Sequence, residues 1–594
     1  MTDLTAEPDQ SRDPVARLLL GLAAVAVAFA AADTYVVVLA LPEMMAGTGL
    51  SAEDLQQAAP IISGFMLGYV AALPLVGRIA DLRGRAPVLI GSLIVFAVGS
   101  LVTASAYDLP SMVSGRVLQG IGGGGLLPAT LSLVADIYPP TKRGLPLGIV
   151  GAVQEFGNVV GPLYGAVVLA FGTWRDIFWI NLAVGLMLAA VIRSRGSELR
   201  VGGIKRGTRP DLISLATAVA ALGVVTLVMR APRSLTENVT LGTFFLPIVG
   251  SSRWLSPLAL VAVGLGLLLV VRGLTATAPL LDLRSWATVL AQIDVVGAVL
   301  LTLALAGVIL AFATADPAVQ VFSPEGPWLI SGSAVATIAF WRRNRSARNA
   351  LVPPGSLAQT PAWGALLVSF FVGAALIAAL VDIPIFARIT VYGDSQLAAA
   401  LVLVRFLVGL PIGAFLGGWW THRAPAGVVT AVGMVIAGSG FGWMTQWGLE
   451  SLRNPVATIP LVLAGLGVGL AMAPVNASLL AATDYAVHGV TSALLVVART
   501  VGKLIGISAL TTIGLRRYYA TEANLPGPKE ICPGGRSRCP EFTHLLRETG
   551  LVQLHTIFLG AAICCAIAGV IALIVFRGAQ TRDVATPVFG AEFG

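Results

Sequence analysis

The stretch "GRIADLRGR", from Gly77 to Arg85, joins two long apolar runs of the sequence. Gly77 has no side chain and therefore permits a close helix contact. Asp81 can pair with Arg83 or Arg85, or it can face the N-terminus of a helix, where the helix dipole favours a negative charge. An ordinary basic turn between helices would not need this combination of residues. We therefore predict a polar latch at one end of a bundle of packed helices.

The apolar runs beside this stretch belong to a pattern that fills nearly the whole chain. Of the 594 residues, 56% are hydrophobic and 11% are charged, whereas soluble domains carry about 25% charged residues. Runs of roughly 20 apolar residues recur, each long enough to cross the ~30 Å hydrocarbon layer of a membrane. The chain starts with the polar segment "MTDLTAEPDQSRDPVAR", and no cleavage site follows the first run. This run is therefore expected to be a retained span.

The apolar runs are grouped as six, four and six. The expected spans are roughly 17–41, 58–80, 87–106, 110–137, 144–170 and 176–193, then 211–229, 256–272, 290–314 and 327–341, and finally 362–387, 396–420, 427–447, 456–480, 489–514 and 551–576. This grouping predicts an all-α integral membrane protein with two six-helix bundles and central linker helices. Segment 327–341 is short for a span, so fourteen spans stay an alternative to sixteen.

The basic residues indicate how the chain is oriented. More than half of the 38 Lys and Arg residues fall in segments on one side of this arrangement, as the positive-inside rule requires of cytoplasmic loops. We therefore expect a multi-pass protein of the cytoplasmic membrane with both termini in the cytoplasm. The same distribution accounts for the net charge of +8 and argues against nucleic acid as a partner.

The spans divide the chain into regions. These are a cytoplasmic tail at 1–16, a first bundle at 17–193, a basic cytoplasmic linker at 194–210, central hairpins at 211–355, a second bundle at 356–578 with an external loop at 515–550, and a cytoplasmic tail at 579–594. The central region is interpreted as two copies of one hairpin, because "PDLISLATAVAALGVVTLVMR" resembles "AQIDVVGAVLLTLALAGVILAF". Two parallel bundles place a substrate site near the membrane midplane between them.

Charged residues inside the spans are the candidate functional residues, because a charge in hydrocarbon is costly unless it is paired or wetted. The acids are Asp33 in "AADTYVVVLALP", Glu155 in "GAVQEFGNVVGPLYG" and Asp382 in "ALVDIPIF". The bases are Arg116 in "SGRVLQGIGGGG", Arg405 in "LVLVRFLVG", and Arg499 and Lys503 in "VVARTVGKLIG". The acids are either proton carriers or ion-pair partners that hold the bundle together.

A buried carboxylate can carry a proton if its surroundings change. Burial raises the pKa of a carboxyl group and a nearby arginine lowers it. An acid whose contacts with water and arginine differ between two states can load a proton on one side and release it on the other. We expect Asp33 to be the first coupling residue, and Arg116 and Arg405 to pair with the acids and tune them. The four histidines lie in loops or near span ends and do not compete for this role.

Several of these stretches resemble signatures of the major facilitator superfamily. "GRIADLRGR" resembles its cytoplasmic loop signature, "SGRVLQGIGGGG" its fourth-span signature, and "DTYVVVLALP" the first-span signature of its drug:proton antiporters with extra central spans. "GAVQEFGNVVGPLYG" resembles the fifth-span antiporter signature, in which Gly157 and Gly161 form a small-residue face and Pro162 bends the helix. The closest resemblance is to the actinobacterial triacylglyceride and multidrug exporters that act with a periplasmic lipoprotein.

The resemblance covers about residues 18–195 and 355–578. It implies proton-coupled export of a triacylglyceride-like lipid or a lipophilic drug by alternating access, with the proton gradient as driving force, no cofactor, and a monomer as the working unit. Gly77, Asp81, Arg83 and Arg85 would gate the cytoplasmic side. In the matching loop of the second half, "GGWWTHRAPAG", His422 stands where an acid is expected. The second central hairpin and the external loop depart from the family pattern, so the lipoprotein partner and the cargo stay open.

Other functions are weighed against export. An uptake symporter for a polar solute would need more Asn, Gln and His inside the spans, and an uncoupled lipid transporter stays an alternative. A membrane enzyme would need a base beside a nucleophile. Only Asp484 and His488, in "TDYAVHG", approach such a pair, and we expect them to cap a helix.

The cysteines of the external loop flank "PGGRSR". In an oxidising compartment Cys532 and Cys539 are expected to form a disulfide, and two free thiols are the alternative. A metal site is not expected there, because the only imidazole nearby in the sequence is His544.

Overall fold

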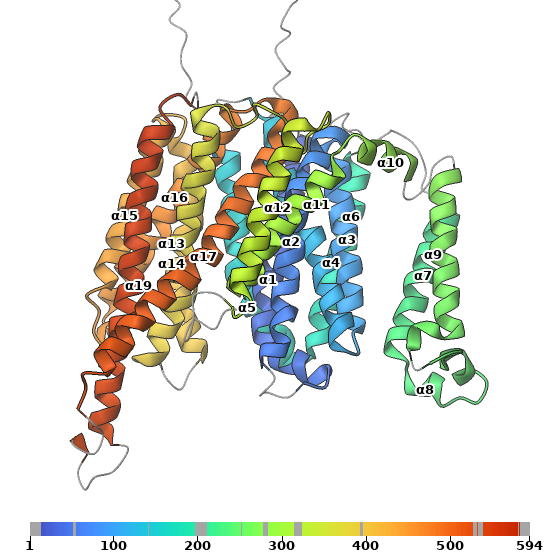
Figure 1. Ribbon diagram of the computed structural model, residues 1–594, viewed down its shortest axis with the longest axis horizontal. Helices are drawn as coiled ribbons and strands as arrows, with labels where there is room; N and C mark the ends of the chain where they lie inside the picture. Colours follow the sequence, from blue (N-terminus) through green and yellow to red (C-terminus); the bar gives the residue numbers. More distant parts are fainter. Residues whose placement is uncertain are drawn as a thin grey trace, which may run out of the picture.

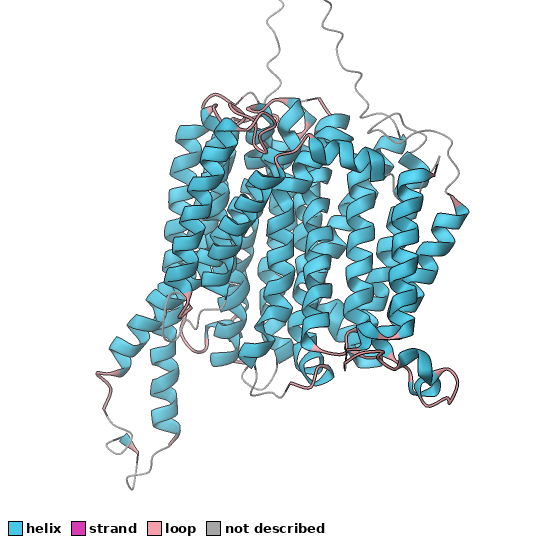
Figure 2. Cartoon of the chain, turned by 45° about the vertical axis from the view of Figure 1, so that its right-hand side comes forward, coloured by secondary structure: helices cyan, strands magenta, loops and turns pink. Residues whose placement is uncertain are grey.

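The computed structural model describes residues 14–50, 55–139, 142–196, 211–250, 252–276, 283–313, 323–392, 396–526, 531–532, 539–579 and 581. Within these residues all regular structure is helical (Figure 2), which confirms the predicted fold class. The linker 194–210 and the two terminal tails lie almost wholly outside the described residues.

Two bundles of long helices stand side by side (Figure 1). The first contains α1 (Pro14–Gly47), α2 (Leu55–Arg83), α3 (Arg85–Ser105), α4 (Leu109–Ile137), α5 (Gly144–Phe171) and α6 (Trp174–Gly196). The second contains α13 (Thr360–Ile389), α14 (Gln396–Trp420), α15 (Ala426–Met444), α16 (Thr458–Ala481), α17 (His488–Glu522) and α19 (Pro540–Val575). We call the end where α1 begins and α19 ends, drawn at the top of Figure 1, the upper end.

The two bundles repeat the same internal packing. Helix α1 packs on α5 as α13 packs on α17, and α3 packs on α4 as α15 packs on α16. Glycines permit the first of these contacts. A Cβ atom on Gly157 would lie 2.2 Å from the carbonyl oxygen of Ala28, and one on Gly502 would lie 2.0 Å from that of Phe370. Such small-residue faces let backbones approach closely, as expected of membrane helices.

Local sequence sets the helix ends at the turns that matter for the site. Helix α2 ends and α3 begins around Gly84, whose φ of 96° lies in the left-handed region that favours glycine. At the other end of α3, the Asp108 carboxylate accepts a hydrogen bond from the backbone N–H of Ser111 at 2.9 Å, and the Ser111 hydroxyl accepts one from the Asp108 N–H. This capping box begins α4.

The central region forms two hairpins. The first consists of α7 (Leu212–Arg230) and α9 (Pro257–Thr275), joined by the short helices α8 (Arg233–Thr236), η4 (Gly242–Phe245) and η5 (Arg253–Leu255). It stands beside the first bundle, on the side away from the second (Figure 1). The second consists of α11 (Val295–Ala313) and α12 (Gly326–Ser346). Its arm α11 contacts α2 of the first bundle and α17 of the second.

Both hairpins are closed at the upper end by the same kind of ion pair. Asp211, just before α7, bonds to Arg272 near the end of α9, and Asp294, just before α11, lies 3.2 Å from Arg343 near the end of α12. The hydroxyl of Ser214 and the guanidinium of Arg272 donate to the Asp211 carboxylate and lower its pKa to about 2. The two hairpins thus share a similar closure, and the duplication of one hairpin stays a prediction.

Each of the predicted spans overlaps a helix, with one change of boundary. The predicted segment 290–314 is divided, because a short helix, α10 (Leu283–Ala291), ends before α11 begins at Val295. Helix α10 is amphipathic and lies across the upper end (Figure 1). Of the described helices, fourteen are long and apolar enough to cross a membrane. Helices α5 and α12 are not among these fourteen, so the number of spans is fourteen to sixteen.

Candidate functional site

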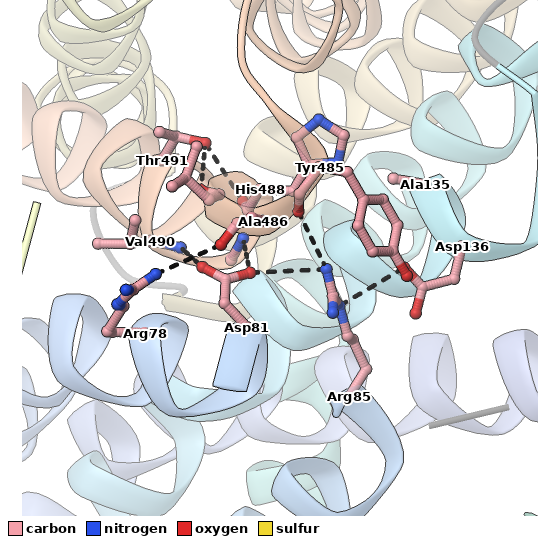
Figure 3. Close-up of polar contacts among 12 residues, drawn as sticks. Arg78, Asp81, Arg85, Ala135, Asp136, Tyr485, Ala486, His488, Val490 and Thr491 are labelled. Carbon is pink, nitrogen blue, oxygen red and sulfur yellow. Dashed lines mark hydrogen bonds and ion pairs between the residues drawn. The ribbon is translucent and has the colours of Figure 1, made fainter. Parts of the chain in front are cut away.

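The predicted latch residue Asp81 joins the two bundles at the upper end. Its carboxylate, on α2, accepts hydrogen bonds from the backbone N–H groups of Gly489 at 2.7 Å and Val490 at 3.0 Å, in the first turn of α17 (Figure 3). The positive end of the helix dipole stabilises a carboxylate at this position. Arg85 lies 3.5 Å from the same carboxylate. Asp81 therefore meets both partners that its position in the sequence predicts, an arginine and a helix N-terminus.

Residues that the sequence did not reveal complete the latch. The Arg85 guanidinium also lies 3.5 Å from Asp136 and 4.8 Å from the centre of the Tyr485 ring. Arg78 donates to the carbonyl oxygen of Ala486 at 3.3 Å. Figure 3 shows these side chains converging on the turn that precedes α17. The latch is thus a charged cluster on the first bundle that holds backbone groups of the second.

The backbones of the two bundles also touch at the upper end. A Cβ atom on Gly77 would lie 2.5 Å from the carbonyl oxygen of Gly489, and one on Gly144 would lie 2.7 Å from that of Gly418. These contacts join α2 to α17 and α5 to α14. In the second contact the residue that meets α5 is Gly418, in the last turns of α14 and four residues before His422. The bundles are therefore closed against each other at this end.

The predicted gate residue Arg83 has a different role. Its guanidinium lies 4.6 Å from the centre of the Trp286 ring in α10, and Arg85 is the arginine that approaches Asp81. Arg83 ends α2 and Arg85 begins α3, on either side of the turn at Gly84, so the spacing alone could not choose between them. His488, which we considered as part of an enzyme site, begins α17 and directs its Nε2 atom to the carbonyl oxygens of Leu480 and Thr483 at 3.1 Å each. This geometry gives His488 a structural role.

Asp33 and Arg116 form an ion pair in the interior of the first bundle. Their closest atoms, Asp33 Oδ2 and Arg116 Nη1, are 2.6 Å apart, and both side chains are almost completely buried. The second carboxylate oxygen of Asp33 accepts a hydrogen bond from the Asn181 side-chain amide on α6. The sequence places Asn181 in the polar-containing stretch "WRDIFWIN", but nothing in that stretch indicates that it faces Asp33.

Further contacts hold Arg116 in place. It donates to the side-chain oxygen of Gln119 at 3.0 Å and to the carbonyl oxygen of Ile61 at 3.3 Å. The Phe65 ring centre lies 4.6 Å from the guanidinium. Because a buried ion pair is costly unless its remaining polar atoms are satisfied, this network explains how the first bundle accommodates two charges.

Glu155, on α5, is the second buried acid. Its Oε2 atom accepts a hydrogen bond from the Asn158 amide at 2.8 Å, whereas its buried Oε1 atom has no hydrogen-bond partner. Glu155 is close enough to Arg499 and Lys503, on α17, to interact with both electrostatically. No ion pair joins it to either cation within the described residues. The three charges therefore face one another across the two bundles without direct contact.

A cavity of about 70 Å³ lies at this point between the bundles. Its first wall is mainly apolar and comes from α1, α2 and α4, and includes Ala30, Phe65 and Leu126. The opposite wall, from α17, carries Arg499 and Lys503. Drug-sized ligands occupy pockets of about 300–1,000 Å³. The cavity is consequently too small, in this conformation, for a large ligand.

The acid of the second bundle is not paired as expected. Asp382 is 3% exposed and, among the described residues, makes no hydrogen bond or ion pair. Arg405, its expected partner one helix later, donates to the Thr458 hydroxyl at 3.2 Å. The two residues lie on neighbouring helices, but their side chains do not meet.

The remaining predicted residues lie away from the cavity. Gly157 and Gly161 contact α1 through the carbonyl oxygens of Ala28 and Ala32. Pro162 is part of α5, and its side chain lies outside the described part of the chain. Cys532 and Cys539 are joined by a disulfide between α17 and α19.

Comparison with known proteins assigns the family. A family model described as Major Facilitator Superfamily matches residues 23–341. The chain belongs to the Major Facilitator Superfamily. A protein of Mycolicibacterium hassiacum named triacylglyceride transporter is 36% identical over 86% of this chain and 82% of its own length. Another of that name, from Mycolicibacterium smegmatis, is 31% identical over 97% of this chain and 90% of its own length.

A solved structure supports the fold. The major facilitator proton:xylose symporter XylE, bound to 6-bromo-6-deoxy-D-glucose, aligns with a TM-score of 0.51 at 12% sequence identity, over 94% of each chain. At this identity the likeness concerns the fold alone. Membership of the Major Facilitator Superfamily agrees with the two six-helix bundles and makes this chain a transporter.

Proposed function

We propose that the chain is a proton-coupled exporter of triacylglyceride-like lipids across the cytoplasmic membrane. The observation that carries this proposal is the cavity between the bundles, in which apolar walls meet the cations Arg499 and Lys503. Apolar walls suit a lipophilic cargo. The relatives named triacylglyceride transporter support the same class of cargo.

The carboxylates beside the cavity support coupling to protons, because ionisable groups within a membrane commonly mark proton pathways. Glu155 lies behind the cavity wall, and its hydrogen-bond partner Asn158 lines that wall. A proton on Glu155 would weaken its attraction for Arg499 and Lys503, which belong to the other bundle. Protonation would then change how strongly the bundles are held together and bias one conformation over another.

Asp33 is the second candidate for coupling. Phe65 lines the cavity and also stacks on Arg116, so the Asp33–Arg116 pair lies one side chain behind the wall. A movement of Phe65 would wet this pair and allow Asp33 to exchange a proton. Each proton that crosses provides about 2.3 kcal/mol per 100 mV of membrane potential.

The closed upper end supports alternating access. A cavity of about 70 Å³ must enlarge to admit a lipid, and the bundles can separate at the upper end only if the Asp81 hydrogen bonds to α17 break. We therefore assign Asp81 and Arg85 to the gate that seals the cytoplasmic side while the cavity is open to the other side.

Transport in proteoliposomes tests this proposal. A fluorescent triacylglyceride and a lipophilic cation are followed with and without an imposed pH gradient. We expect gradient-driven movement of the lipid by the wild type and its loss in Glu155→Gln, which keeps the shape of the side chain and its contact with Asn158. Glu450→Gln is the matched control, because Glu450 is exposed and its ion pair within the described residues is with Arg453.

Two results would contradict the proposal. Lipid movement that is equal with and without a gradient, and unchanged in Glu155→Gln, would identify a passive lipid conduit. Movement of the cation alone would assign the cavity to drug-like cargo.

A further inference from the structure

We propose that the seam between the first bundle and the hairpin α7–α9 binds an anionic phospholipid from the surrounding membrane leaflet. The seam lies at the lower end, opposite the latch. The last turn of α3 and the first turns of α4 and α6 form one side. The last turn of α7, the short helix η5 and the first turn of α9 form the other. The seam is separate from the cavity between the bundles, so the inference does not depend on the proposed transport activity.

The seam contains a cavity of about 570 Å³, which is within the range of about 300–1,000 Å³ for small-molecule sites. Val102 of α3 and Leu118 of α4 line it on one side, and Val225 of α7 and Trp254 of η5 line it on the other. Asp108, Ser111, Ser114 and Ser252 add polar groups to the lining. The apolar part of the lining suits an acyl chain.

The hairpin leaves the seam accessible to lipid. Apolar side chains along both of its arms are exposed, including Val219 at 64% and Leu267 at 61%. Exposed apolar faces of this kind are expected of helices that are surrounded by lipid. A leaflet lipid can therefore reach the cavity from the side without passing through the bundle.

Two arginines lie next to residues that line this cavity. The Arg253 guanidinium is 4.4 Å from the centre of the Tyr107 ring and donates to the carbonyl oxygen of Met229 at 3.1 Å. Tyr107 and Met229 both line the cavity. Arg230, the residue after Met229, lies 5.9 Å from the Trp179 ring centre on α6.

Arg175 adds a third positive charge at the same place. It donates to the carbonyl oxygen of Ala106 at 2.9 Å, directly before Tyr107, and lies 4.2 Å from the Trp174 ring centre. It is also close enough to Arg230 for the two like charges to interact. The three arginines therefore lie in the same part of the seam, although they come from three separate parts of the chain.

These charges are not paired directly with acids in the described part of the chain. No carboxylate there forms an ion pair with Arg175, Arg230 or Arg253. Asp108 caps α4. Asp176 accepts from the backbone N–H and the hydroxyl of Thr173 and is close enough to Arg230 to interact with it electrostatically. Arg230 and Arg253 are exposed. Like charges held close together repel one another, and a bound anion offsets that repulsion.

An anionic phospholipid suits both the arginines and the cavity of this site. Its phosphate matches the planar fork of arginine, which binds phosphate in a bidentate manner, and its acyl chain would fill the apolar cavity. On the cytoplasmic side of membranes, basic pockets between helices bind anionic headgroups, and the arginines of this seam offer the same chemistry at the opposite end. Trp179, which is only partly buried and lies beside Arg230, is a residue type expected at the level of the headgroups.

Binding of labelled phosphatidylglycerol to the purified full chain in detergent tests the site. Phosphatidylcholine and soluble glycerol phosphate serve as competitors. We expect the double variant Arg230→Gln/Arg253→Gln to bind phosphatidylglycerol roughly 10- to 30-fold more weakly, from about 1 kcal/mol for each basic residue near a membrane surface. Arg453→Gln is the control, because Arg453 is an exposed arginine paired with Glu450, and we expect it to bind as the wild type does.

A second variant tests the cavity without changing charge. Val225→Trp places a large side chain in the seam and should weaken phosphatidylglycerol binding while the thermal unfolding of the protein stays near that of the wild type. Undiminished binding by the arginine double variant would overturn the proposal. Equal competition by phosphatidylcholine would also overturn it, because the arginines would then not select an anionic headgroup. Equal competition by glycerol phosphate would assign the arginines to a free phosphate.

Discussion

The carboxylate of Asp81, in the first bundle, accepts a hydrogen bond from the backbone N–H of Gly489, in the second bundle, at 2.7 Å. The two residues are 408 positions apart in the sequence. Together with the bond from Val490, this contact lets a side chain of one bundle cap a helix of the other. Opening the upper end must therefore break a charge-assisted contact and expose the first N–H groups of α17.

Asp81→Asn should shift the chain away from the state that is closed at the upper end. An amide has one acceptor oxygen and no negative charge for Arg85 or for the dipole of α17. A hydrogen bond to a charged group contributes about 1.5–3 kcal/mol, so we expect the ratio of closed to open molecules to fall by roughly tenfold or more. Distances between spin labels at the upper ends of α4 and α16 measure this ratio. An unchanged distance distribution would remove Asp81 from the gate.

Gly77→Ala should hinder the same closure by a steric route. The new Cβ atom would lie 2.5 Å from the carbonyl oxygen of Gly489, so α2 and α17 would have to move apart. We expect slower transport and a wider spin-label distance at the upper end. Gly21→Ala, also in the first bundle, is the control, because a Cβ atom there meets nothing within 4 Å. Equal effects of the two substitutions would argue against a specific contact.

The Asp33–Arg116 pair should show strong coupling in a double-mutant cycle. Asp33→Asn leaves a buried arginine without its counter-ion, and breaking a buried pair in this way costs about 3–5 kcal/mol. Neutralising both partners, in Asp33→Asn/Arg116→Gln, should recover most of that stability while coupling to the proton gradient stays lost. Thermal unfolding and gradient-driven transport separate the two effects. If the double variant is no more stable than Asp33→Asn, the unpaired Arg116 charge does not cause the loss of stability in Asp33→Asn.

Gly157→Ala should destabilise the first bundle. Its Cβ atom would lie 2.2 Å from the carbonyl oxygen of Ala28, and forcing extra volume into a close helix contact costs about 1–3 kcal/mol. Gly151→Ala, on the same helix, would approach Met472 only to 4.0 Å and should be close to neutral. Thermal unfolding in detergent compares the two variants. Similar unfolding temperatures would mean that α1 and α5 can move apart without loss of stability.

Much of the architecture could be predicted from the sequence, because membrane spans are a local property of the chain. A run of apolar residues is either long enough to cross the hydrocarbon layer or it is not, and each predicted span overlaps a helix. The buried charges could be found for the same reason, since Asp33, Glu155 and Arg116 stand out in apolar runs and prove to be buried. The amphipathic α10 was missed because it is short, and its last residues, Leu290 and Ala291, fall within the predicted span 290–314.

Only the tertiary structure decided which of these residues meet. Asp33 pairs with Arg116 and Asn181, whereas Asp382 and Arg405 stay apart. The sequence had predicted an arginine partner for both acids. The pairing depends on the rotation and register of helices that are far apart in the chain, and no local pattern encodes these. The contact between Asp81 and α17 is of this kind, because the acceptor can be recognised in "GRIADLRGR" but the donors are backbone groups that every residue except proline possesses.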